Sequence, residues 1–159
     1  MIYSCAVRGW LTILSVILPY KSGKIAALGE ISAPAVKTLD LRGDCFVSAG
    51  WIDSHVHCYP KSPIYFDEPD SIGIATGVTT VIDAGSTGAD DIDDFYALTR
   101  QATTDVYALL NISRVGLIAQ NELADMNNID AGAVNAGGKT PSGFYRRPQG
   151  ADEQQRGRR

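Results

Sequence analysis

From residue 50 onward, the chain alternates between short apolar runs and stretches with helical spacing. The apolar runs are rich in β-branched residues and predict three strands, over 51–57, 78–82 and 106–112. Between the second and third runs, residues recur at the spacing of one helix face: Ile92, Phe95, Tyr96 and Thr99. Shorter helices are predicted over 70–76 and 117–126. Strands that alternate with helices are typical of an α/β protein with a parallel sheet or barrel.

The first 49 residues follow a different pattern, in which short strands are separated by turn residues. Strands are predicted over 24–28, 37–41 and 45–47, and together they indicate a small antiparallel β unit. The longest apolar run, at 10–18, is about half as long as the ~18 residues that cross a bilayer. We therefore interpret this run as a buried strand or a short core helix, and we predict no membrane partner.

The hydrophobic periodicity stops after residue 130. Residues 131–159 contain no Leu or Ile, six Gly, two Pro and a cluster of basic side chains. They offer too little apolar surface for a core of their own, so we predict that this tail is disordered or foreign to the preceding domain. The chain is thus divided into an N-terminal β segment (1–49), an α/β part (50–130) and a basic tail (131–159).

Composition is typical of a soluble globular protein. Hydrophobic residues make up 45% and charged residues 20% of the 159 residues, which excludes collagen-like, coiled-coil and wholly disordered chains. The three cysteines have no paired spacing that would suggest a disulfide scaffold or a metal knuckle, and this favours a reducing, cytoplasmic location. A net charge of −4 gives no reason to expect nucleic acid as a partner.

The candidate chemistry is concentrated at the end of the first α/β strand. Successive side chains of a strand point to opposite faces, so Asp53, His55 and His57 are expected on one side. Imidazole is the commonest metal ligand, and two imidazoles supply half of a zinc coordination sphere. Asp53 could fix the orientation of an imidazole, or it could be a hydrogen-bonding strand residue. Spacing alone also allows a pair of partly exposed histidines without a metal.

Two motifs follow each other in this region. The first is Ser-Ala-Gly-Trp-Ile-Asp-Ser-His-Val-His at 48–57, and the second is Gly-Val-Thr-Thr-Val-Ile-Asp-Ala-Gly at 77–85. In this order they resemble the amidohydrolase superfamily, in its dihydroorotase-like and deacetylase-like branch. The resemblance extends through 23–29, 111–114 and 121–125, so that it spans residues 23–130.

The resemblance implies a (β/α)₈ TIM-type barrel preceded by a small β-sandwich segment, with about the first three βα units in this chain. It also implies a mono- or binuclear centre of zinc or another divalent metal, with His55 and His57 on the more buried ion. A metal-activated water would then attack an amide, cyclic amide or ester carbonyl of a small-molecule substrate. The family's bridging lysine, two later histidines and final aspartate have no counterparts here. We therefore expect a truncated hydrolase that is inactive alone, with its catalytic acid/base beyond this chain.

Four further polar residues lie at or beyond the carboxyl ends of the second and third α/β strands. They are Asp83, Ser86, Asn111 and Arg114. At such positions they could bind and orient a substrate, because α/β barrels place their active sites at this end of the strands. They could equally cap helices or line turns.

The sequence leaves other functions open. The chain could be a non-enzymatic remnant or an interaction module, since its basic tail could bind acidic surfaces. Residues 133–140 imitate a P-loop and suggest a nucleotide binder, although no strand is predicted before them and no helix after them. The unpaired edges of an incomplete barrel would also allow a homo-oligomer.

Overall fold

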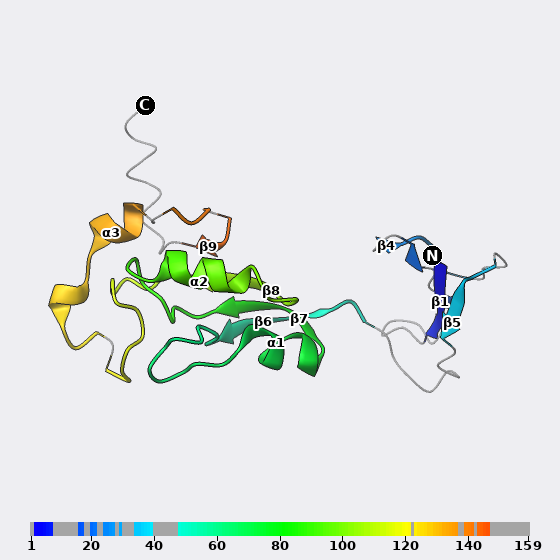
Figure 1. The fold of residues 1–159 in the computed structure, drawn as a ribbon, viewed down its shortest axis with the longest axis horizontal. Helices are drawn as coiled ribbons and strands as arrows, with labels where there is room; N and C mark the ends of the chain where they lie inside the picture. Colours follow the sequence, from blue (N-terminus) through cyan, green and yellow to red (C-terminus); the bar gives the residue numbers. More distant parts are fainter. Residues whose placement is uncertain are drawn as a thin grey trace, which may run out of the picture. The chain divides into compact units, whose positions relative to one another are not determined.

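The computed structural model divides the chain into two units, Met1–Ala49 and Gly50–Arg159, and each is described by itself (Figure 1). The described residues are 2–7, 16–17, 20–21, 24–27, 29, 34–39, 48–121, 123–136, 139–141 and 143–146. Within these residues, no helix has both the length and the apolar character needed to cross a membrane. The cytoplasmic location stays a prediction.

The described residues of the first unit form a five-stranded sheet. Its strands are β1 (Ile2–Val7), β2 (Val16–Ile17), β3 (Tyr20–Lys21), β4 (Lys24–Ile25) and β5 (Lys37–Leu39). Pairing is antiparallel between β1 and β2, β1 and β3, and β3 and β4, whereas β5 pairs with β1 in parallel. The predicted antiparallel unit therefore agrees with this sheet except at β5. The strand predicted over 45–47 lies outside the described residues, and β2 is the described part of the apolar run at 10–18.

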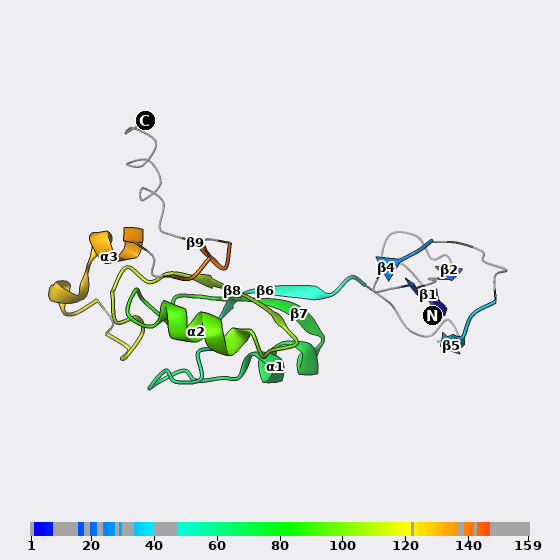
Figure 2. The same cartoon turned by 45° about the horizontal axis from the view of Figure 1, so that its top comes forward.

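The second unit is built on a parallel sheet (Figures 1 and 2). Its strands pair in chain order: β6 (Trp51–Val56), β7 (Val78–Asp83), β8 (Asp105–Leu109) and β9 (Tyr145–Arg146). The connections contain α1 (Pro69–Ile72), η1 (Ile74–Thr76), α2 (Ile92–Thr99), η2 (Met126–Asn128) and α3 (Ala131–Ala136). The predicted α/β class with parallel strands is confirmed, and the barrel stays a prediction.

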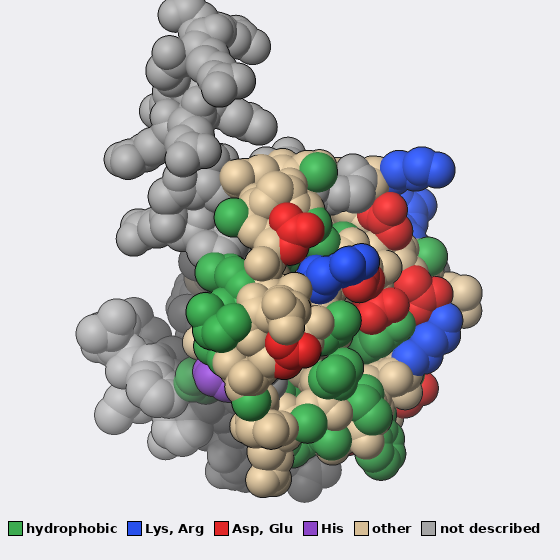
Figure 3. Space-filling model, turned by 90° about the vertical axis from the view of Figure 1, so that its left-hand side faces the viewer, with side chains coloured by type: hydrophobic (Ala, Val, Ile, Leu, Met, Phe, Trp, Pro, Cys, Tyr) green, Lys and Arg blue, Asp and Glu red, His purple; other side chains and the backbone are tan. Residues whose placement is uncertain are grey.

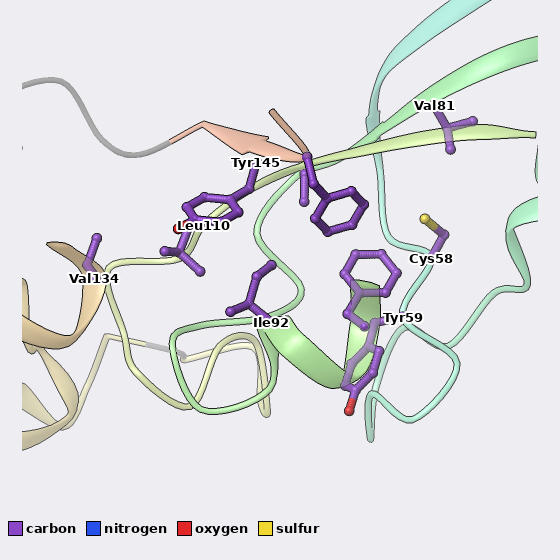
Figure 4. Packing of buried hydrophobic residues seen from close by; sticks show 10 residues of the cluster. Cys58, Tyr59, Val81, Ile92, Leu110, Val134 and Tyr145 are labelled. Atoms are coloured by element: carbon purple, nitrogen blue, oxygen red, sulfur yellow. The ribbon is translucent and has the colours of Figure 1, made fainter. Parts of the chain in front are cut away.

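Helix α2 packs on the sheet and supplies the centre of the hydrophobic core. Its residues Ile92 and Phe95 are fully buried in a cluster that includes Val81 of β7. The Phe95 ring centroid lies 5.4 Å from that of Tyr59 and 5.7 Å from that of Phe144. Figure 4 shows that side chains from the strands, from α2 and from the C-terminal segment meet here. The predicted helix face at residues 92–99 is confirmed.

Residues after 130 also pack on this core, contrary to the prediction from the sequence. Asp130 accepts the backbone N–H of Ala133 at 2.8 Å, where α3 begins. Val134, Phe144 and Tyr145 are buried in the core cluster, and β9 pairs with β8. Three apolar side chains are too few for a separate core, but they are enough to join an existing one. The predicted disorder therefore does not hold for the described part of this segment, and residues 147–159 lie outside the described residues.

The helix predicted over 117–126 does not form. Residues 117–121 and 123–125 are turns and irregular structure, and only η2 makes a short helical turn. The Leu117 N–H donates to the Ser86 carbonyl at 3.0 Å, so this stretch begins in a contact with the β7–α2 loop. The Asp125 carboxylate accepts the Asn127 N–H at 3.0 Å and starts η2 instead. Local side-chain hydrogen bonds of this kind compete with a regular helix.

The carboxylate of Asp93 in α2 holds the turn that leads into β9. It accepts the backbone N–H groups of Lys139 at 2.9 Å and Thr140 at 2.8 Å, and the Thr140 hydroxyl at 2.5 Å. In a P-loop, amides of this stretch would be presented to a phosphate. Because the exposed Asp93 carboxylate of this same chain takes these two amides, the geometry favours a structural anchor over a nucleotide site.

Replacing Asp93 with Asn is expected to lower the free energy of unfolding by at most about 1 kcal/mol near pH 7, because solvent screens the bonds of this exposed carboxylate. The hydrogen bonds to this carboxylate lower the pKa of Asp93, and the bond from the Thr140 hydroxyl has the largest effect. A group with a lowered folded pKa stabilises above its unfolded pKa, about 3.9 for Asp, and loses this effect as the pH falls through the folded pKa. Urea unfolding at neutral and acidic pH measures the difference, which should vanish in acid.

The matched control for this prediction is Asp90→Asn. Asp90 lies in the same acidic stretch, but its partner is the half-exposed Arg114 at 3.0 Å, and such surface pairs contribute little. A loss of stability that is equal in both variants would contradict the anchoring role of Asp93.

Candidate functional site

The two histidines lie at the carboxyl end of β6. His55 is in the strand and exposed, and His57 follows the strand and is half-buried. Their ring centroids are 5.7 Å apart, with the ring planes at 89°. The predicted convergence of the two imidazoles is therefore present. Because β6 and β7 are parallel, the loop that follows β7 leaves the sheet at this same end.

The strict alternation expected for β6 is interrupted. The register with β7 shifts between Asp53 and Val56, where the two strands advance by different numbers of residues. Such an irregularity changes the direction of the side chains around it. The Asp53 carboxylate accepts the backbone N–H of His55 at 3.1 Å. Of the two roles left open for Asp53, the geometry supports that of a hydrogen-bonding strand residue.

The His57 ring is contacted by two side chains from outside strand β6, Ser86 and Tyr65. Its Nδ1 lies 3.0 Å from the Ser86 hydroxyl oxygen, and its ring stacks on Tyr65 at a centroid distance of 5.1 Å and 21° between planes. Tyr65 reaches this place because the loop after β6 turns back, with an antiparallel bridge between Cys58 and Phe66. Sequence reasoning missed Tyr65, since no spacing relates it to His57.

Asp83 is fully buried beneath the site. Its Oδ2 accepts the backbone N–H of Cys58 at 2.8 Å, and its Oδ1 accepts the backbone N–H of Ser86 at 2.7 Å. Burial, and then the charge of Asp83, raise the pKa of the Cys58 thiol well above its usual range, so this buried thiol stays neutral. A substrate-orienting role for Asp83 does not fit this burial.

The other two predicted polar residues connect loops. Asn111 donates from Nδ2 to the Gly85 carbonyl at 2.9 Å and accepts the Ser113 N–H at 2.9 Å. Arg114 donates to the Asp90 carboxylate at 3.0 Å at the surface. Figure 3 shows acidic and basic side chains close together on one face of the molecule. The structure thus brings Ser86 to His57, and it uses Asn111 and Arg114 to hold turns.

The loop after β7 is tightly packed against the loop after β8. A Cβ on Gly88 would overlap the carbonyl oxygen of Ser113, and a Cβ on Gly116 would overlap that of Ser86. Gly116 also has a φ of +67°, which favours glycine. These contacts hold the backbone at Ser86 and just after it in place.

The imidazole nitrogens of His55 and His57 are of the type that zinc and similar ions bind, and they could supply two ligands. Two rings on one tetrahedral ion, at the usual Zn–N distance of ~2.0 Å, have centroids about 5 Å apart. The observed separation of His55 and His57 is close to this value. No group of three or more His, Cys, Asp or Glu side chains that could hold a metal is found among the residues that the structure describes. The pair therefore offers half of a coordination sphere.

Comparisons with known proteins give several relatives, although no family model matches the chain. A deacetylase of Enterococcus faecalis is 47% identical over 137 residues, which are 84% of this chain and 37% of the relative. The crystal structure of an adenine deaminase is 46% identical with a TM-score of 0.72, covering 85% of this chain and 37% of that chain. The crystal structure of a dihydroorotase is 28% identical with a TM-score of 0.79, covering 92% and 41%.

The matched region is large in this chain and small in its relatives. The chain spans between 28% and 37% of the length of the three deacetylases that it matches. Within that region, the relatives found by sequence and those found by backbone similarity belong to the same superfamily. On this evidence the chain belongs to the amidohydrolase superfamily.

Proposed function

We propose that this chain is part of a metal-dependent hydrolase that acts on an amide, cyclic amide or ester carbonyl of a small molecule, with His55 and His57 as metal ligands. The single observation that carries the proposal is the convergence of the two imidazoles at the carboxyl end of β6. The names of the relatives support it, because deacetylation, deamination of adenine and opening of dihydroorotate are all hydrolyses.

The fold that we propose for the intact enzyme is a (β/α)₈ barrel. Strands β6, β7 and β8 with the helices between them would be its first units, and residues 1–49 would belong to a small β-sandwich. The parallel order of these strands and the similarity to the dihydroorotase structure support this arrangement. In such barrels the site lies at the carboxyl ends of the strands, where His55 and His57 lie.

A mono- or binuclear centre of divalent metal would make water nucleophilic near neutral pH and polarise the substrate carbonyl. The residues of this chain would hold and orient it. His57 has its Nδ1 at the Ser86 hydroxyl, so Nε2 is the nitrogen that remains for the ion. Tyr65 covers one face of the His57 ring, and His55 is open to solvent for its share of the coordination.

Two imidazoles are one ligand fewer than the ~3 protein ligands of a usual catalytic zinc. We therefore expect the 159-residue chain to bind zinc weakly and to hydrolyse little or no substrate. The test is a zinc titration of the chain and of the double variant His55→Ala, His57→Ala, with hydrolysis of an N-acetyl amide and of dihydroorotate followed in parallel. The double variant should lose the binding that the unchanged chain shows.

The control is Lys61→Ala, which changes the same loop region at an exposed residue that pairs with Asp94. It should bind zinc as the unchanged chain does. Equal zinc binding by the double variant and the unchanged chain would overturn the assignment of the two histidines. In that case the non-enzymatic alternative would stand.

A further inference from the structure

We propose that Ser86, held in place by Asp83, is a positioning residue that sets the ring orientation and the tautomer of His57. The inference rests on the proposed function, because it concerns how this chain prepares one of the proposed ligands. It gives Ser86 and Asp83 a role other than contact with a substrate.

The His57 ring is restrained in three directions. The Ser86 hydroxyl oxygen lies in hydrogen-bond distance of Nδ1, at 3.0 Å. Tyr65 stacks on the face of the ring, and the His55 ring meets it at 89°. Rotation about the side-chain bonds of His57 would break these contacts. Nε2 is therefore the ring nitrogen left for a ligand.

Ser86 is itself fixed by the backbone around it. Ser86 is buried, with only 3% of its surface exposed. Its N–H donates to Asp83 Oδ1 at 2.7 Å, and its carbonyl accepts the Leu117 N–H at 3.0 Å. The second oxygen of Asp83 accepts the N–H of Cys58, the residue that follows His57, at 2.8 Å. One buried carboxylate thus connects the backbone beside His57 to the backbone of Ser86.

This connection has a chemical consequence for the imidazole. A neutral histidine can give Nε2 to a metal only when its proton is on Nδ1, and the hydrogen bond at the other nitrogen selects that form. In the proposed state, Nδ1–H donates to the Ser86 oxygen. If the hydroxyl donated to Nδ1 instead, Nε2 would carry the proton and could not bind a metal. The tautomer of His57 therefore distinguishes the two cases.

The first measurement is NMR of the imidazole nitrogens in the metal-free chain, well above the usual histidine pKa of ~6.5. His57 is assigned by comparison with His55→Gln. In the unchanged chain, His57 is expected in the Nδ1–H form. Ser86→Ala should lose the preference for this form, and Ser86→Thr should restore it. Thr87→Val is the matched control, because the neighbouring Thr87 hydroxyl is buried without a hydrogen-bond partner among the described residues. An Nε2–H form in the unchanged chain would overturn the inference.

The second measurement is zinc affinity of the same variants. Ser86→Ala should bind zinc roughly tenfold more weakly or worse, as is typical when a group behind a ligand is removed, and Thr87→Val should bind normally. Should His57→Ala lose zinc while Ser86→Ala keeps full affinity, the inference fails and the proposed function stands. Should His57→Ala bind zinc normally, both fail. Asp83→Asn is a supporting variant. If Asp83→Asn does not fold, Ser86→Ala still decides the test.

Discussion

Phe144→Ala is expected to lower the free energy of unfolding of the second unit by about 3–5 kcal/mol. The Phe144 side chain is buried, with its ring centroid 5.7 Å from that of Phe95 and 5.1 Å from that of Tyr96. Its carbonyl accepts the Ala108 N–H at 3.0 Å, a backbone bond that alanine can keep. The loss therefore reports the cavity left by the ring. Urea unfolding followed by circular dichroism measures it.

The matched control is Phe66→Ala, which removes the same ring from a residue that is 63% exposed. Its effect should stay within about 0.5 kcal/mol, as is usual for surface substitutions. If Phe144→Ala is as mild as Phe66→Ala, the segment 143–146 does not pack on the core of this chain in solution.

Gly88→Ala is expected to destabilise the chain by about 1–3 kcal/mol, the usual cost of forcing an extra methyl into a packed site. The new Cβ would overlap the backbone of Ser113, which cannot move aside as a flexible side chain can. The loops after β7 and β8 must then separate, and Ser86, two residues from Gly88, loses its fixed backbone. Unfolding and zinc titration should both show the change.

The control is Gly143→Ala, because a Cβ at Gly143 would meet nothing within 4 Å. Its unfolding and zinc binding should match those of the unchanged chain. A Gly88→Ala variant that is as stable as Gly143→Ala would show that the two loops do not need their close contact.

Local patterns were enough to predict the elements that depend on local preferences. The strands at 51–57 and 78–82 and the helix face at 92–99 follow from β-branched runs and from helical periodicity, and they are present as β6, β7 and α2. His55 and His57 could be predicted as a pair because they are two residues apart at the end of one predicted strand. The irregular register of β6 was not visible in that spacing, since it depends on the neighbouring strand.

Contacts between distant residues explain what the sequence did not predict. The segment after 130 has no periodicity of its own, and its packing depends on Asp93 and Phe95, about 50 residues earlier in the chain. The pairing of Ser86 with His57 and the stacking of Tyr65 likewise result from the way the loops turn back. Its position beyond the carboxyl end of a predicted strand made Ser86 a candidate, and only the three-dimensional arrangement identified His57 as its partner.

The late position of β9 in the chain has a consequence during synthesis. Phe144 follows Tyr96 by 48 residues, and a ribosome adds about 5–20 residues per second. For roughly 2–10 s, the nascent chain therefore carries α2 without the ring that covers Phe95 and Tyr96. During this interval, which ends when β9 adds to β8, the exposed apolar surface of α2 favours aggregation of the emerging polypeptide.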